Sequence, residues 1–371
     1  MQESELPGLV AQVLWASFAL AVAFGAIAQR THFCTMGAVA DIVNMGDRTR
    51  MRMWVLSMGV AVLGFNAMVA LGWVQAAQTV YAGPRLIWLS NLLGGLLFGV
   101  GMVLASGCGS KTLVRVGEGS LKSLVVLVVL AVSAYATMRG ITAVARVATV
   151  DTVALTLPMG QDLPSIAAAV TGQGKASMAA WVGGLVGLLM LGWALARPEG
   201  RSADTLLGGL GVGAVIVAVW WVSGRLGHLM EHPVTLEEVF LATNSQRMES
   251  LSFVAPVAYG LDWLILFSDK SKLLTLGIVS SLGVAVGSFV VARAKGSFRW
   301  QGFAGTEDTA NHLVGAVLMG VGGVTAMGCT VGQGLSGIST LALGSFIAVG
   351  GIVAGAVVAL RYQVWRLDRM A

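Results

Sequence analysis

Three cysteines, Cys34, Cys108 and Cys329, are the residues of this chain best suited to chemistry. Each stands where an apolar run meets a segment rich in glycine or hydroxyl side chains. An odd number of cysteines without a CxxC pair argues against a disulfide framework and predicts free thiols. A lone cysteine in an apolar helix is usually a small filler with a weak S–H donor. At a break between helices, the same thiol suits a soft, polarisable ligand, because it can donate weakly to a terminal sulfur.

Two of the cysteines end copies of one motif. "GVGMVLASGC" ends at Cys108 and "GVGGVTAMGC" ends at Cys329, and the two match at 7 of 10 positions. The first copy continues into "GSKTLVRVGEGS" and the second into "TVGQGLSG". Glycine lets successive N–H groups turn toward one point, and helix N-termini add partial positive charge, so such breaks can hold an anion without Arg or Lys. The predicted binding residues are Cys34, Cys108, Cys329, Gly107, Gly109, Ser110, Gly328 and Thr330.

Close helix packing is the other interpretation of these glycines, because small residues bring membrane helices together. It remains the better explanation for pairs such as Gly95 with Gly99 or Gly183 with Gly187. The glycine-rich break at Cys108 recurs at Cys329 in the second copy of the motif. This recurrence favours a functional role for the glycines that flank these two cysteines.

The elements that must position these residues are membrane helices. The chain has 371 residues, is 56% hydrophobic and only 11% charged, and has a mean hydropathy of +0.81. Soluble domains carry about 25% charged residues. The composition therefore predicts an all-α integral membrane protein. Runs of roughly 20 apolar residues predict about nine spanning helices, at 9–29, 53–74, 87–107, 120–138, 177–196, 205–223, 273–292, 310–328 and 341–360.

Two apolar stretches, 33–46 and 253–267, are too short to cross and are predicted to be re-entrant half-helices. Such backbone is tolerated at membrane depth only where protein or a cavity covers it. Threading the nine spans from an outer N-terminus places 15 of the 23 basic residues inside, which favours a cytoplasmic C-terminus. The N-terminal residues lack the basic region of a cleavable signal, so the first run is expected to stay as a helix.

The organisation predicted from the repeat has three parts. Residues 1–140 form a first repeat, 141–204 hold an outer loop insertion and a linking helix, and 205–371 form a second repeat with a re-entrant segment at 250–268. The odd number of crossings between the copies gives them opposite orientations. Inverted repeats typically place a substrate site near the midplane, between discontinuous helices.

Several other signals carry less weight. "HLMEH" at 228–232 fits an inverted zinc-peptidase pattern, but Pro233 stops it and a third ligand is not evident, so no metal and no cofactor is expected. "GQGLSG" at 332–337 matches the GxGxxG pattern of dinucleotide-binding domains, but no soluble strand precedes it, so nucleotide binding is not expected. Met36 and Met327 raise Cu(I) as an alternative cargo. Asp41 and Asp262 are ionisable groups at membrane depth, and either proton coupling or anchoring of the half-helices would explain them.

The net charge is +5, and the basic residues are scattered between apolar runs, so a nucleic-acid partner is not expected.

The chain resembles the YeeE/YedE family of sulfur transporters at three segments, "THFCTMGAVADI", "GVGMVLASGCGSKTLVRVGEGS" and "GVGGVTAMGCTVGQGLSGIS". The resemblance implies an inverted-repeat fold of nine spanning helices in the bacterial inner membrane. It also implies that Cys34, Cys108 and Cys329 pass a sulfur compound along by weak S–H contacts, beside a cytoplasmic TusA-like sulfur carrier.

The resulting expectation is a transporter, not an enzyme, that imports thiosulfate through a path lined by the three thiols, with helix ends and amides holding the anion. Two alternatives stay open. One is a membrane sulfurtransferase in which a cysteine becomes a persulfide, for which Lys111 beside Cys108 is the obvious activating neighbour. The other is transport of a different sulfur or selenium compound.

Overall fold

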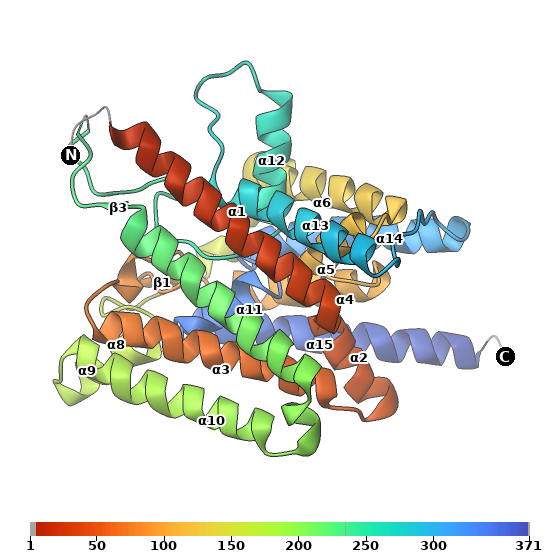
Figure 1. Ribbon diagram of the computed structural model, residues 1–371, viewed down its shortest axis with the longest axis horizontal. Helices are drawn as coiled ribbons and strands as arrows, with labels where there is room; N and C mark the ends of the chain where they lie inside the picture. The colour runs from red at the N-terminus through yellow and green to blue at the C-terminus, as the bar shows by residue number, and fades with distance from the viewer. Residues whose placement is uncertain (1–4, 234, 370–371) are drawn as a thin grey trace.

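A bundle of roughly parallel and antiparallel helices makes up the computed structural model, which describes residues 5–233 and 235–369 (Figure 1). The two ends of the chain lie at opposite ends of this bundle, and most long helices run between those ends. The long helices are α1 (Leu6–Thr31), α3 (Thr49–Ala70), α4 (Trp88–Leu104), α6 (Leu121–Arg139), α10 (Gly184–Leu195), α11 (Ala203–Trp221), α13 (Leu276–Ala294), α14 (Thr306–Thr325) and α15 (Leu343–Asp368).

Short elements connect and cap the long helices. The short α-helices are α2 (Thr35–Met45), α5 (Gly109–Gly117), α7 (Ile141–Ala148), α8 (Leu163–Thr171), α9 (Lys175–Met178) and α12 (Ala255–Ile265). Tighter or wider turns are η2 (Ala76–Gln78), η3 (Val150–Thr152), η4 (Ala179–Gly183), η5 (Pro198–Arg201), η6 (Val222–Leu226) and η7 (Gly332–Gly337). Two antiparallel pairs complete the fold: β1 (Arg85–Leu86) with β2 (Leu155–Thr156), and β3 (His228–Leu229) with β4 (Val239–Phe240).

Eight segments within the described residues are long and apolar enough to cross a membrane. They correspond to eight of the runs predicted above. The remaining predicted run, 310–328, also forms a helix, α14, of 20 residues. That helix begins with the polar sequence "TEDTANH" and packs against α4 and α6. Eight of the nine expected spans therefore meet the criteria of length and composition. The ninth, α14, is long enough but not apolar enough, because polar residues occupy its first two turns.

The two predicted half-helices form as α2 and α12, each of 11 residues. A helix of that length rises only about 16 Å at 1.5 Å per residue. This is about half of the ~30 Å hydrocarbon thickness. The end of α2 is marked by Gly46 in the left-handed region, at φ 70°. Helix α2 packs against α3 and α15, and α12 packs against α6 and α13.

The packing partners repeat in a crossed pattern. Helix α1 packs on α13 as α11 packs on α3, and α4 packs on α15 as α14 packs on α6. In the same way α2 contacts α15 while α12 contacts α6. The matched helices α1 with α11, and α4 with α14, also contact each other across the centre. Crossed contacts of this kind are what two copies of one unit, each packed against the other, would produce.

Glycine permits the closest of these helix contacts. A Cβ at Gly287 of α13 would stand 2.0 Å from the carbonyl oxygen of Val22 in α1. Likewise, a Cβ at Gly99 of α4 would stand 2.2 Å from the carbonyl oxygen of Ile352 in α15. Close backbone approach is how membrane helices gain packing energy where lipid is as apolar as the side chains. These glycines therefore serve the fold, as expected for the small-residue spacing.

The insertion between α6 and α10 is more ordered than a loop. It holds α7, β2, α8 and α9, and its β2 pairs with β1. Asp162 caps α8 by accepting a hydrogen bond from the N–H of Ser165 at 2.9 Å. Backbone bonds also join Leu163 to the oxygen of Leu341, and Leu343 to the oxygen of Gln161. The insertion thus holds the segment that follows η7 in place.

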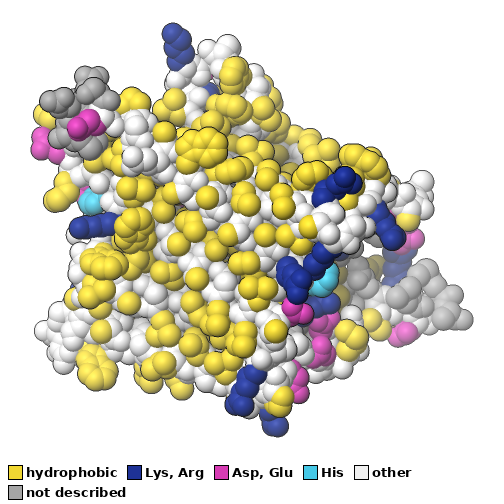
Figure 2. Space-filling view, viewed as in Figure 1, with side chains coloured by type: hydrophobic (Ala, Val, Ile, Leu, Met, Phe, Trp, Pro, Cys, Tyr) yellow, Lys and Arg dark blue, Asp and Glu magenta, His cyan; other side chains and the backbone are white. Residues whose placement is uncertain are grey.

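Side-chain character divides the surface into a middle and two ends (Figure 2). Hydrophobic side chains cover the middle of the visible face, and Lys and Arg gather mainly at the end near the C-terminus. Apolar residues of α10 such as Leu188, 63% exposed, point outward. An apolar band between charged ends is the surface expected of a protein that crosses a bilayer.

Candidate functional site

Each cysteine follows a helix end of the same design. The residue two positions before each cysteine is in the left-handed region, and the next N–H bonds to a carbonyl five residues back, as in a Schellman cap. The left-handed residues are His32 (φ 54°), Ser106 (φ 55°) and Met327 (φ 59°). The bonds are Phe33 N–H to Ala28 at 3.1 Å, Gly107 N–H to Met102 at 2.8 Å and Gly328 N–H to Gly323 at 2.7 Å. Helices α1, α4 and α14 thereby stop and turn identically.

Two of the cysteines also cap the helix that follows. Cys34 is the N-cap of α2, and its sulfur accepts a hydrogen bond from the N–H of Gly37 at 3.3 Å. Cys108 is the N-cap of α5, and its sulfur lies 3.3 Å from Oγ of Ser110. These two thiols lie at helix N-termini, where free N–H groups and the helix dipole favour negative charge. Cys329 instead precedes the turn η7, and its sulfur accepts from the N–H of Gly332 at 3.4 Å.

The surroundings of Cys329 come from both halves of the chain. Its side chain is fully buried, and the N–H groups of Phe253 and Val331 also face the sulfur. Tyr81, from the segment before β1, lies beside it. Within the described residues the buried hydroxyl of Thr330 has no hydrogen-bond partner. A free hydroxyl and several N–H groups around one sulfur are the donors that a small oxyanion requires.

Cys108 is buried and lies near both other thiols. Gly109 approaches the side chain of Phe253, where a Cβ would stand 3.8 Å from that of the phenylalanine. The predicted residue Gly107 lies against Lys111, whose ammonium pairs with Glu118 at 3.7 Å. Because Phe253 contacts both cysteine loops, the two copies of the motif meet at this residue.

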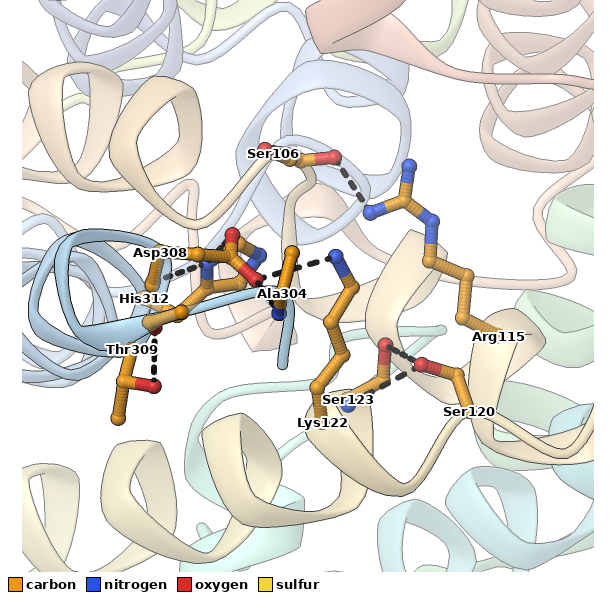
Figure 3. Close-up of polar contacts among 10 residues, drawn as sticks. Ser106, Arg115, Ser120, Lys122, Ser123, Ala304, Asp308, Thr309 and His312 are labelled. Carbon is orange, nitrogen blue, oxygen red and sulfur yellow. Dashed lines mark hydrogen bonds and ion pairs between the residues drawn. The ribbon is translucent and has the colours of Figure 1, made fainter. Parts of the chain in front are cut away.

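The loop before Cys108 is fixed by a neighbouring arginine. Arg115 of α5 reaches back to the carbonyl oxygen of Ser106, and Nη1 donates to that oxygen at 2.7 Å (Figure 3). The same view shows Lys122 extending toward Asp308, with Nζ 3.8 Å from Oδ2. Oδ1 of Asp308 in turn lies 3.0 Å from Nδ1 of His312. This polar cluster joins the starts of α6 and α14 on the side that holds Cys34.

Cys34 is half-buried and is the most accessible of the three thiols. Lys111 and Arg115 lie in its electrostatic range. The guanidinium of Arg50 lies against Gly37, one turn into α2. Of these three basic side chains, Arg50 pairs with Asp41 and Lys111 with Glu118.

Two cavities open on the other side of the site, beside Cys329. One has a volume of about 340 Å³ and the other about 210 Å³, and they share Val80, Tyr81 and Met327. Arg85 and Arg247 line the larger cavity. It also contains Gln333 and Ser345, whose Oε1 and Oγ atoms are buried without a partner among the described residues.

These cavity residues were missed by the sequence reasoning. Tyr81, Arg85 and Arg247 lie in connecting segments outside the repeated motifs. Arg85 follows Pro84 in an otherwise uncharged connection, which is a weak local signal of a binding role. Nothing in the sequence indicates that Arg85 and Arg247 line the same cavity. The predicted residues, in contrast, lie together: Gly328 lines the smaller cavity, Thr330 follows Cys329, and Gly107, Gly109 and Ser110 surround Cys108.

The two aspartates predicted to lie at membrane depth are both paired. Oδ2 of Asp41 in α2 lies 3.2 Å from Nε of Arg50. Oδ2 of Asp262 in α12 lies 2.6 Å from Nζ of Lys272, and its Oδ1 accepts from the hydroxyl of Tyr135 at 2.7 Å. Each carboxylate joins a half-helix to the segment that follows it. Of the two explanations left open, this geometry supports anchoring.

The weaker motifs have structural explanations. His228 of "HLMEH" pairs with Glu238 at 2.7 Å and stacks on Phe240. "GQGLSG" is the buried turn η7, and Gly334 within it faces the ring of Trp54. Among residues 5–233 and 235–369, no group of three or more His, Cys, Asp and Glu residues could hold a metal ion.

A bundle of membrane-crossing helices with thiol-lined breaks at its centre and cavities on one side defines a membrane transport protein. The chain belongs to the sulphur-transport family, whose pattern it matches over residues 30–358. The resemblance to YeeE/YedE proteins is thus confirmed.

Named relatives agree with this assignment. The chain is similar to the thiosulfate transporter TsuA of Escherichia coli, at 27% identity over 84% of this chain and 83% of that protein. It is 26% identical to the thiosulfate transporter TsuA of Spirochaeta thermophila, over 91% of this chain and 94% of that protein. A 100-residue part, 27% of this chain and 23% of the relative, is 33% identical to the probable transporter YedE of Salmonella typhimurium. These relatives are transporters, which supports a transporter over a sulfurtransferase.

Proposed function

We propose that the protein imports thiosulfate across the bacterial inner membrane along a path formed by Cys329, Cys108 and Cys34 in that order. The observation that carries the proposal is the placement of three thiols at three identical helix breaks, with Cys108 near both others. The names of the two full-length relatives support thiosulfate as the substrate.

The anion enters from the side of the two cavities. Arg85 and Arg247 attract it there, and the hydroxyls of Thr330 and Ser345 offer free donors next to the loop of Cys329. Thiosulfate has three oxygens and one terminal sulfur. Backbone N–H groups and hydroxyls suit the oxygens, and a thiol S–H suits the polarisable sulfur. The anion then moves between thiols without a covalent bond.

The orientation follows from charge. Basic residues gather at the end near the C-terminus, toward which α2 with its N-cap Cys34 also lies, and the positive-inside rule makes that end cytoplasmic. The N-terminus is then outside. A cytoplasmic TusA-like carrier is the expected acceptor of the imported sulfur, and co-purification of such a carrier with the membrane protein would check it. The crossed helix contacts support the two inverted repeats proposed at 1–140 and 205–371, linked by 141–204.

Uptake of radiolabelled thiosulfate into proteoliposomes tests the proposal, with selenite, sulfite and sulfate as competitors. Cys108→Ala and Cys329→Ala should each reduce uptake at least ~100-fold while the protein remains in the membrane. Wild-type uptake by both variants would refute the thiol path. Stronger competition by selenite than by unlabelled thiosulfate would reassign the substrate.

The sulfurtransferase alternative has its own measurement. A persulfide requires an activated thiolate, and Lys111 is the nearest cation to Cys108 in sequence. Intact-mass analysis after exposure to thiosulfate should show an unmodified chain. A stable added sulfur on Cys34, Cys108 or Cys329 would favour the enzyme instead.

A further inference from the structure

The smaller cavity beside Cys329 contains a carboxyl group that the thiol path does not use. Glu249 lines this cavity of about 210 Å³ together with Tyr81, Tyr259, Met327 and Gly328. Gly328 precedes Cys329 directly, so the cavity that Glu249 lines borders the loop of the first thiol on the proposed path.

The backbone holds Glu249 in a defined place. Its N–H donates to Oγ of Ser223 at 2.9 Å. The preceding residue, Met248, is fully buried against Gly224 and bonds through its backbone to Gln78 and Val80. Because the segment is fixed on both sides, the position of the carboxyl group is a property of the fold and not of a free loop.

The contacts of this carboxyl group leave its charge without a cation. Ser245 donates to Oε1 from its N–H at 3.0 Å and also from its hydroxyl. In the described part of the chain, Oε2 has no hydrogen bond and Glu249 forms no ion pair. Arg247, two residues earlier, lines the larger cavity and donates to the carbonyl oxygen of Thr79 at 3.5 Å. Glu249 is half-buried, and its desolvation raises the pKa of the carboxyl group above its ordinary value, against the opposing effect of the two Ser245 bonds.

A fixed negative charge in this cavity conflicts with the proposed cargo. Thiosulfate is a dianion, and two like charges in a partly dehydrated space repel strongly. Protonation of Glu249 removes the repulsion and adds an O–H donor, which can face the anion from Oε2. A proton on Glu249 and an anion in the cavity therefore stabilise each other.

We propose that Glu249 is a proton-binding site whose protonation is coupled to anion binding at the outer cavity. The inference rests on the proposed function and extends it: the cargo is a divalent oxyanion whose entry into this cavity takes up one proton. Binding is reversible: the proton passes from the outer solution onto Oε2 and returns to that solution once the anion has left the cavity. While the anion is bound, the anion and Glu249 together carry two negative charges in place of three.

Other titratable groups around the cavity do not account for such coupling. Tyr81 comes from the segment before β1, and burial raises the pKa of its hydroxyl further from neutrality. Tyr259 of α12 is likewise a phenol, and the arginine and lysine side chains stay protonated near neutral pH. Beyond Tyr259, Asp262 is already paired with Lys272. None of the four histidines lines this cavity.

The test is radiolabelled thiosulfate uptake into proteoliposomes at fixed internal pH and external pH from 5.5 to 8.5. Wild-type uptake at low substrate concentration should fall as external pH rises through the pKa, approaching ~10-fold per unit, since one protonated group is required. Glu249→Gln keeps the cavity neutral, so its uptake should be independent of external pH.

Two further variants sharpen the result. Ser245→Ala removes a bond that favours the charged carboxylate, so it should move the midpoint upward by up to about one pH unit. The matched control is Glu237→Gln, because Glu237 is exposed in the same connecting segment, and it should keep the wild-type profile.

The outcomes separate the two proposals. Uptake by the wild type that is independent of external pH would overturn the coupling and leave thiosulfate transport standing. Absence of uptake by the wild type at every pH would overturn both. A pH dependence that persists unchanged in Glu249→Gln would also overturn the assignment, whereas a midpoint shift in Ser245→Ala supports it even if Glu249→Gln does not assemble.

Discussion

Nη1 of Arg115 donates a hydrogen bond of 2.7 Å to the carbonyl oxygen of Ser106, two residues before Cys108. Ser106 is held in the left-handed region, which costs energy for a residue with a side chain. The guanidinium therefore stabilises the turn that presents Cys108 at the start of α5.

Replacement of Arg115 by Gln should loosen this turn. A hydrogen bond to a charged group contributes about 1.5–3 kcal/mol, so thermal stability in detergent should fall and uptake with it. Arg293→Gln is the control, because Arg293 is exposed at the end of α13. Equal stability of the two variants would show that the turn holds without the arginine.

Helix contact at glycine can be tested within α15. A Cβ at Gly355 would stand 2.3 Å from the carbonyl oxygen of Leu96, whereas a Cβ at Gly350 meets nothing within 4 Å. Gly355→Ala should cost about 1–3 kcal/mol through overpacking and lower the melting temperature. Gly350→Ala should leave that temperature unchanged, and a similar loss in both would contradict the packing assignment.

The anchoring role of the paired aspartates predicts a stability effect without a change in pH profile. Asp262→Asn leaves Lys272 unpaired, and breaking a buried pair costs about 3–5 kcal/mol, less here because Lys272 is 19% exposed. The double variant with Lys272→Gln should recover part of this loss. If Asp262→Asn instead removed the pH dependence of uptake, the proton site would lie there and not at Glu249.

The unpaired hydroxyl of Thr330 predicts a binding effect without a stability effect. Thr330→Val keeps the shape and removes a buried group that has no partner among the described residues. Folding stability should stay within ~0.5 kcal/mol or rise, while the KM for thiosulfate should increase ~10-fold, equivalent to ~1.4 kcal/mol of a donor's contribution. Thr137→Val, whose hydroxyl bonds to the carbonyl oxygen of Ser133, is the control and should leave KM unchanged.

The membrane potential opposes the entry of a dianion. Moving one elementary charge across 100 mV requires about 2.3 kcal/mol, so an inward dianion works against roughly twice that amount when the interior is negative. Dissipating the membrane potential with an ionophore should therefore raise wild-type uptake at constant pH.

The extent to which the sequence predicts the site differs between its parts. The motifs around Cys108 and Cys329 predict helix breaks, because in both copies glycine and hydroxyl residues interrupt the apolar run at the cysteine. Both breaks form at the predicted positions. α14 differs from the expected span because the apolar pattern alone does not weigh "TEDTANH" at its start. Tyr81, Arg247 and Glu249 lie in connecting segments with no periodicity, so no local pattern could mark them.

Composition and the repeated motif by themselves determined the class of protein, because charge is scarce and apolar runs of spanning length can be satisfied only by membrane helices. They also determined that the thiols stand at helix breaks, since the break is a local property of the backbone. Only the tertiary structure decided that Phe253 joins the two cysteine loops, and that an unpaired carboxyl group faces the cavity beside Cys329. Those relationships connect residues far apart in the chain, and they exist only once α1, α4, α11 and α14 have packed around a common centre.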